Sequence, residues 1–145
     1  WAAVYSFEQF VWQPEGAPTR GVGVFFSAGV SDGNPNPVKS SYSLGLVGKG
    51  VVPNRPHDNF GIGWARTVLS DDFLRELRAL PLNLGLDYED VVELYYNVSI
   101  TPWLSVSPSL QIVSPALNKT FDPTSQAFKD LDTSYIAGVR VGIRF

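Results

Sequence analysis

The chain of 145 residues contains neither cysteine nor methionine. Without cysteine there are no disulfides, no thiolate nucleophiles and no cysteine-based metal sites. No stretch approaches the roughly 20 apolar residues that a membrane-spanning helix needs. The net charge of −3 gives no basic footprint, so nucleic acid is not an expected partner. Because a natural full-length product begins with Met, we expect Trp1 to be a processed terminus or a point inside a longer chain.

Glycine, proline and aromatic residues are abundant instead. The chain has 13 Gly, 11 Pro, 4 Trp, 6 Tyr and 9 Phe, a composition that fits short strands joined by turns. Apolar and polar residues alternate in about seven stretches, the pattern of a β-strand with one apolar face. These stretches are residues 1–13, 21–31, 38–49, 60–65, 89–101, 104–112 and 134–145. In the first stretch the apolar residues change face part of the way along, so we expect a β-bulge there.

The last stretch has the most regular alternation. From Ser134 to Phe145 every second residue is apolar, and the other face carries Ser, Gly and Arg, with Ile136 as the exception. Such a strand closes an outer-membrane β-barrel, where lipid lies on one side and water on the other. The apolar face of the last two stretches carries no charged residue. An Arg or Lys on a face in lipid would cost roughly 2–4 kcal/mol at the bilayer midplane. The pattern predicts an all-β fold, an antiparallel transmembrane β-barrel.

The connections between the stretches alternate in length. Residues 115–133 and 69–88 form long connections, whereas 101–103, 50–59 and 14–20 are shorter, and 32–37 is short for its place in the alternation. Outer-membrane barrels have short periplasmic turns and longer outside loops. Within the 69–88 connection the spacing of the apolar residues becomes helical over 70–80. Ser70 is the expected N-cap of this helix, and Asp71 and Asp72 follow it.

Two segments resemble the carbohydrate-selective porins of the OprB type. They are Pro-Asn-Arg-Pro-His-Asp-Asn-Phe-Gly-Ile-Gly at 53–63 and Thr-Pro-Trp-Leu-Ser-Val-Ser-Pro-Ser-Leu-Gln at 101–111, joined by Tyr88-Glu89 and the final Arg144-Phe145. The resemblance covers residues 1–145 and implies the C-terminal segment of a single porin domain, about seven strands of a barrel of roughly sixteen. It also implies passive diffusion of small sugars through a water-filled channel in the bacterial outer membrane, and a terminal Phe145 recognised by the barrel-insertion machinery. Phe145 is then a true C-terminus, and the first strand of the barrel precedes Trp1.

Several charged, amide and aromatic side chains are expected on the polar side of the strands. Groups of this kind replace, step by step, the water hydrogen bonds of sugar hydroxyls, and an aromatic ring stacks on the sugar. The alternative is that they are ordinary solvated residues of the lumen. The lumen candidates are Glu8, Lys39, Glu93, Tyr95, Gln111 and Arg140. Lys49 and Arg144 are expected near the periplasmic rim.

Arg66 conflicts with the alternation. It falls on the same face as Ile62 and Trp64, which would place its charge in lipid. We therefore expect the strand to end at Arg66 or a bulge to turn it inward. An alternative is that Arg66 meets a lipopolysaccharide phosphate at the outer rim.

The sequence offers no set of residues for catalysis. His57 is the single histidine, so a zinc site is not expected, and neither a nucleophile–base pair nor a glycine-rich phosphate loop is present. We expect no enzymatic activity, no metal and no cofactor. The expected partners are small sugars, outer-membrane lipid and lipopolysaccharide, and the insertion machinery, while association into a homotrimer stays open. Two other functions also stay open, a structural or anchoring barrel and a soluble β-barrel that binds a small ligand.

Overall fold

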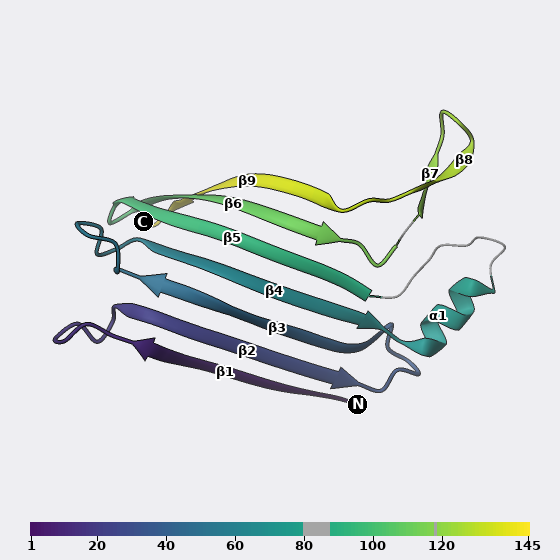
Figure 1. Cartoon of the computed structure of the whole chain (residues 1–145), viewed down its shortest axis with the longest axis horizontal. Helices are drawn as coiled ribbons and strands as arrows, with labels where there is room; N and C mark the ends of the chain where they lie inside the picture. Colours follow the sequence, from purple (N-terminus) through teal and green to yellow (C-terminus); the bar gives the residue numbers. More distant parts are fainter. Residues whose placement is uncertain (80–87, 118) are drawn as a thin grey trace.

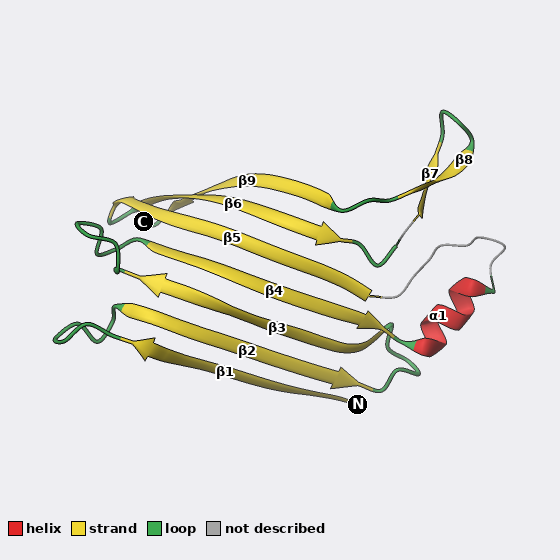
Figure 2. Cartoon of the chain, viewed as in Figure 1, coloured by secondary structure: helices red, strands yellow, loops and turns green. Residues whose placement is uncertain are grey.

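The computed structural model describes residues 1–79, 88–117 and 119–145. This part of the chain forms nine strands and one short helix (Figures 1 and 2). The elements are β1 (Ala2–Trp12), β2 (Gly21–Ser31), β3 (Val38–Lys49), β4 (Asn59–Leu69), α1 (Asp71–Arg78), β5 (Tyr88–Thr101), β6 (Leu104–Ser114), β7 (Lys119–Asp122), β8 (Ala127–Asp130) and β9 (Ser134–Ile143). All seven predicted strands are present, and the antiparallel all-β fold is confirmed.

Seven of the strands form one antiparallel sheet in the order β1-β2-β3-β4-β5-β6-β9. The three short connections, β1–β2, β3–β4 and β5–β6, lie together with the C-terminus at one end of the sheet, which we call the turn end (Figure 1). The β2–β3 connection, α1 and the β7–β8 hairpin lie at the opposite end, which we call the loop end (Figure 1). Successive connections lie at opposite ends because the neighbours are antiparallel. The predicted alternation in length has the expected exception, since residues 32–37 between β2 and β3 form a short connection at the loop end.

The strand register divides the sheet into two chemically different faces. One face carries a row that crosses all seven strands, and we call this the apolar face. Its row is Phe7, Phe26, Leu44, Trp64, Val92, Ile112 and Tyr135. The adjacent row lies on the opposite face, which we call the polar face. That row is Glu8, Phe25, Gly45, Gly63, Glu93, Gln111 and Ile136.

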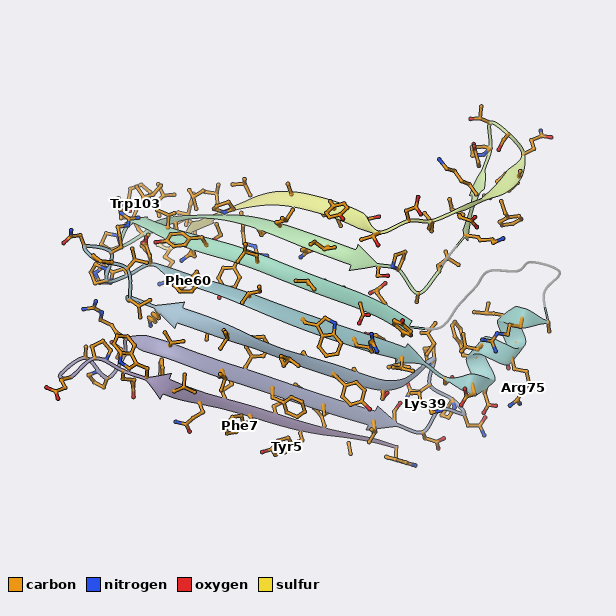
Figure 3. The ribbon with its side chains drawn as sticks, in the orientation of Figure 1. Tyr5, Phe7, Lys39, Phe60, Arg75 and Trp103 are labelled. Atoms are coloured by element: carbon orange, nitrogen blue, oxygen red, sulfur yellow. The ribbon has the colours of Figure 1, made fainter. Side chains whose placement is uncertain are left out.

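The described residues place no protein layer over the apolar face. Val139 and Tyr135 of β9 are 71% and 72% exposed, and Leu74 is the one buried apolar residue of the described part, in α1 rather than in the sheet. Near the turn end the Phe60 and Tyr96 rings lie parallel with their centroids 6.2 Å apart, and Trp103 lies at the same end (Figure 3). An uncovered apolar surface with aromatic residues near its ends is typical of a sheet that faces lipid.

The bulge predicted in the first strand is confirmed. The register between β1 and β2 shifts between Phe10 and Trp12. As a result, Trp12 pairs with Val22 on the apolar face, whereas Glu8 keeps its place opposite Phe25 on the polar face. One extra residue thus reconciles the two alternations in this strand.

The loop end carries the helix and the small hairpin. The Ser70 hydroxyl accepts a hydrogen bond from the Phe73 backbone N–H at 3.2 Å, which confirms the predicted N-cap, and the Ser70 N–H donates to the Pro37 carbonyl at 2.8 Å. The predicted helix end near Leu80 lies outside the described residues. The hairpin was not predicted, because residues 115–133 were expected to form a polar loop; Phe121 and Phe128 meet edge to face in it, 5.7 Å apart. Within the described residues, no helix has both the length and the apolar character to span a membrane.

Candidate functional site

The polar face holds two adjoining hollows in its turn-end half. The larger, of about 530 Å³, is lined by Glu93, Tyr95 and Arg140, together with Asn59, Asn97, Arg144, Gly142 and the serines at 105, 107 and 109. The second, of about 470 Å³, lies nearer the turn end and includes Lys49, His57 and Arg144. Three of the six predicted lumen residues are thus brought together in one place.

The other three predicted residues lie apart from the larger hollow. Gln111 is the direct cross-strand partner of Glu93 but is not among the residues that line the hollow. Glu8 lies on the same face in β1, on the far side of β2, β3 and β4. Lys39 lies at the loop end, where its Nζ donates to Asp71 Oδ2 at 2.6 Å (Figure 3).

Aromatic rings lie against glycines on the polar face. A Cβ added at Gly61 would lie 2.6 Å from a ring carbon of Tyr95, and one added at Gly45 would lie 2.5 Å from a ring carbon of Phe25. The Phe25 ring also comes within 3.1 Å of such a Cβ at Gly63. Both rings therefore pack over backbone that has no side chain. For Tyr95 this position puts the ring in the wall of the larger hollow.

Sequence reasoning missed the neutral polar residues of the site. Asn59 and Asn97 are cross-strand partners on β4 and β5, and both line the two hollows. Asn97 Oδ1 accepts a hydrogen bond from the Ser107 hydroxyl at 2.6 Å. The signal that would have found them is the strand register, which places Asn59 beside Asn97 although 38 residues separate them in sequence.

Hydrogen bonds from segment 53–63 link the β3–β4 connection to the neighbouring strand at the turn end. Asp58 is only 3% exposed and accepts hydrogen bonds from Arg55 Nε at 2.7 Å, the Tyr96 hydroxyl at 2.9 Å and the Ser99 N–H at 2.9 Å. Burial alone would raise the pKa of Asp58, but these hydrogen bonds outweigh it and hold the pKa below the usual 3.8. Asp58 thereby joins the β3–β4 connection to β5.

A second link runs from the same connection to the first turn. Gly50 has a φ of +62°, its N–H donates to the Asp58 carbonyl at 2.8 Å, and its carbonyl accepts from Arg20 Nε at 2.6 Å. A Cβ at Gly50 would lie 2.5 Å from the Pro56 carbonyl oxygen, so glycine is required here by both conformation and space. The β1–β2 and β3–β4 turns are therefore bound to one another.

The prediction for Arg66 is wrong on both counts. β4 continues to Leu69, and its register against β5 runs without a shift from Asn59 to Val68, so Arg66 stays on the apolar face. Its charge is balanced there because its Nε and Nη2 donate to the Asp90 carboxylate at 2.8 and 2.6 Å. The guanidinium carbon lies 4.2 Å from the Tyr88 ring centroid and 5.4 Å from that of Trp64, whose Nε1 also donates to Asp90.

We expect Asp90→Asn to destabilise the folded protein by about 1–3 kcal/mol, because it leaves the Arg66 charge on the apolar face without the carboxylate that balances it. The double variant Arg66→Gln/Asp90→Asn removes both charges and should return to within about 1 kcal/mol of the wild type. Urea unfolding of the full-length protein in phospholipid vesicles, followed by tryptophan fluorescence, measures both. A double variant no more stable than Asp90→Asn alone would show that the unbalanced charge of Arg66 is not the cause of the lost stability.

Comparison with known proteins places this geometry in a family. The carbohydrate-selective porin, OprB family, matches residues 1–145. Porin B of Pseudomonas aeruginosa is 30% identical over 146 residues, which cover 92% of this chain and 30% of Porin B. Porin AaxA of Chlamydia pneumoniae is 29% identical over 86 residues, which cover 59% of this chain and 18% of AaxA.

The fold is also that of a solved porin. The structure titled "High pH structure of Pseudomonas putida OprB" matches with a TM-score of 0.77 and 26% identity, over 97% of this chain and 34% of that one. The chain thus spans about a third or less of the length of these relatives. Both curated relatives are porins by name, and porins form channels. The chain belongs to the OprB family of carbohydrate-selective porins, β-barrel proteins of the bacterial outer membrane.

Proposed function

We propose that this chain forms part of the wall of a water-filled channel through which small sugars diffuse passively. The observation that carries the proposal is the larger hollow of the polar face, because it combines an aromatic ring with hydrogen-bonding groups. Tyr95 offers the ring, Glu93 accepts hydrogen bonds from hydroxyl groups, and Arg140 and Asn97 donate them. In this arrangement a sugar exchanges its water hydrogen bonds for those of the wall without a covalent step.

The same proposal fixes the orientation of the sheet. Short turns lie on the periplasmic side of outer-membrane barrels and long loops outside, so the turn end is periplasmic and α1 is external. The apolar face then contacts lipid, and its loop-end part contacts lipopolysaccharide. Recognition of Phe145 by the insertion machinery, association of three barrels, and residues 1–145 as one part of a single barrel domain remain predictions.

We expect Tyr95→Ala to weaken sugar binding in the channel by about three- to tenfold, the effect of losing one aromatic contact of about 0.5–1.5 kcal/mol. The measurement is the block of single-channel current by glucose, with the full-length protein in planar bilayers. Thr67→Ala, also on the polar face but towards the loop end, is the control and should leave the block unchanged. A channel whose current is insensitive to sugar, or an equal block in Tyr95→Ala, would contradict the proposal.

A further inference from the structure

Three cations that line the hollows of the polar face form no ion pair with another described residue. Within residues 1–79, 88–117 and 119–145, Lys49, Arg140 and Arg144 have no carboxylate within 4.0 Å. Five other cations have such a partner, whereas Arg20 and Lys129, which lie outside the two hollows, have none among the described residues. These ion pairs are Lys39–Asp71, Arg55–Asp58, Arg66–Asp90, Arg75–Asp72 and Lys119–Asp130, with N–O distances from 2.6 to 3.6 Å.

These three cations line one continuous groove. Arg140 lines the larger hollow, Lys49 lines the smaller one, and Arg144 lines both. Asn59 and Asn97 also belong to both hollows, so the two are joined along the turn-end half of the polar face. The charge of the groove is therefore strongly positive at the turn end.

One carboxylate lies at the other end of the groove. Glu93 lines the larger hollow only, and among the described residues that line the two hollows it is the one acidic side chain. In β5 it lies four residues from Asn97, towards the loop end. The groove is thus polarised along the strands, with an acceptor for hydroxyl groups at one end and unpaired cations at the other.

We propose that this groove binds sugar acids, with the carboxylate held by Arg140 and Arg144, while Lys49 adds to the positive charge of the groove from β3. Guanidinium groups bind carboxylates through paired, charge-assisted hydrogen bonds, which a neutral sugar cannot form. From Arg140 the hydroxyl chain of the ligand extends past Ser107 and Asn97 towards Glu93, which repels the carboxylate and so sets the direction of the ligand. This inference rests on the proposed sugar channel and adds a preference for sugars that carry a carboxylate.

The test compares gluconate with glucitol, which has the same carbon chain but a CH₂OH group in place of the carboxylate. The full-length protein is placed in planar bilayers at low salt, and block of the current by each compound is measured. We expect gluconate to block at about tenfold lower concentration than glucitol, the difference that one charge-assisted contact provides. Acetate, a carboxylate without the hydroxyl chain, should block more weakly than gluconate. In molar salt the preference should shrink because the charges are screened.

Variants test whether the preference for gluconate comes from the cations of the groove or from the overall charge of the channel. Arg140→Gln/Arg144→Gln should reduce the preference for gluconate over glucitol to less than about threefold, because the carboxylate loses both guanidinium partners. Arg140 also donates to neutral sugars, so the quantity compared is the ratio of the two blocking concentrations in each protein. Lys119→Gln removes a cation that is paired with Asp130 in the β7–β8 hairpin, and it should keep the full preference. Arg140→Lys/Arg144→Lys keeps the charge and should retain a clear preference. Resistance of the folded band to detergent before heating confirms that each variant is folded.

The outcomes distinguish this inference from the function on which it rests. Equal block by gluconate and glucitol, or a preference that survives Arg140→Gln/Arg144→Gln, would overturn the sugar-acid groove while the sugar channel stands. Equal block by acetate and gluconate would overturn it too, because the groove would then bind anions without recognising sugar. If neither glucose nor glucitol affects the current, the proposed function itself fails.

Discussion

Placing an arginine at Val139 should prevent stable insertion of the sheet, whereas the same residue at Ser109 should be tolerated. Val139 lies in the middle of β9 on the apolar face and is 71% exposed where we expect lipid. A cationic side chain near the bilayer midplane costs about 2–4 kcal/mol. Ser109 lies in the neighbouring strand opposite Gly138, on the polar face, where an added charge stays in water.

The measurement compares Val139→Arg with Ser109→Arg in the full-length protein. Urea unfolding in phospholipid vesicles gives the free energy of unfolding, and the fraction that resists detergent before heating gives the folded yield. We expect Val139→Arg to lose about 2–4 kcal/mol and Ser109→Arg less than about 1 kcal/mol. Equal losses would mean that the two faces do not differ in their surroundings, and a larger loss for Ser109→Arg would mean that the faces have been assigned the wrong way round.

The second large effect concerns the buried carboxylate of the turn end. Asp58→Asn should destabilise the protein by about 2–4 kcal/mol, because the amide cannot accept from Arg55, Tyr96 and Ser99 as the carboxylate does. Asp71→Asn is the matched control, since Asp71 also pairs with a cation but is 73% exposed. Surface pairs of that kind contribute about 1 kcal/mol or less.

The same residue predicts a dependence on pH. The folded-state pKa of Asp58 lies below 3.8, so its contribution to stability is complete above that value and is lost as the pH falls through the folded-state pKa. The free energy of unfolding of the wild type should therefore fall below about pH 4. In Asp58→Asn the fall should be smaller. An identical acid profile in the two proteins would show that Asp58 is not the titrating group.

The strands and their faces could be predicted from the sequence because a membrane sheet repeats a simple rule. A period of two sorts each residue to lipid or to water, so β2 and β3 have the expected bounds and the bulge in β1 appears as a change of phase. The rule failed where a charge had a distant partner. Arg66 seemed unfit for lipid because its partner could not be recognised in the sequence. That partner, Asp90, neutralises Arg66 from 24 residues away, beyond the α1 connection.

The site was predicted in part for the same reason. Glu93, Tyr95 and Arg140 stand out as charged or aromatic residues on a face of Gly and Ser, and the structure brings them together. Asn59 and Asn97 do not stand out, and only the register reveals them as neighbours. The β7–β8 hairpin was missed because four-residue strands are too short to show alternation.

The contact of Phe25 with two glycines has an evolutionary consequence. The ring occupies the space of a Cβ at both Gly45 and Gly63, so three positions on three strands share one volume. A lineage that keeps the phenylalanine is expected to keep both glycines. A small residue at position 25 relieves Gly63 but not Gly45, because a Cβ at Gly45 would also lie too close to the Ile62 carbonyl oxygen. Positions 25 and 63 should therefore vary together among homologous porins, although they lie on different strands, whereas position 45 should stay glycine in both kinds of lineage.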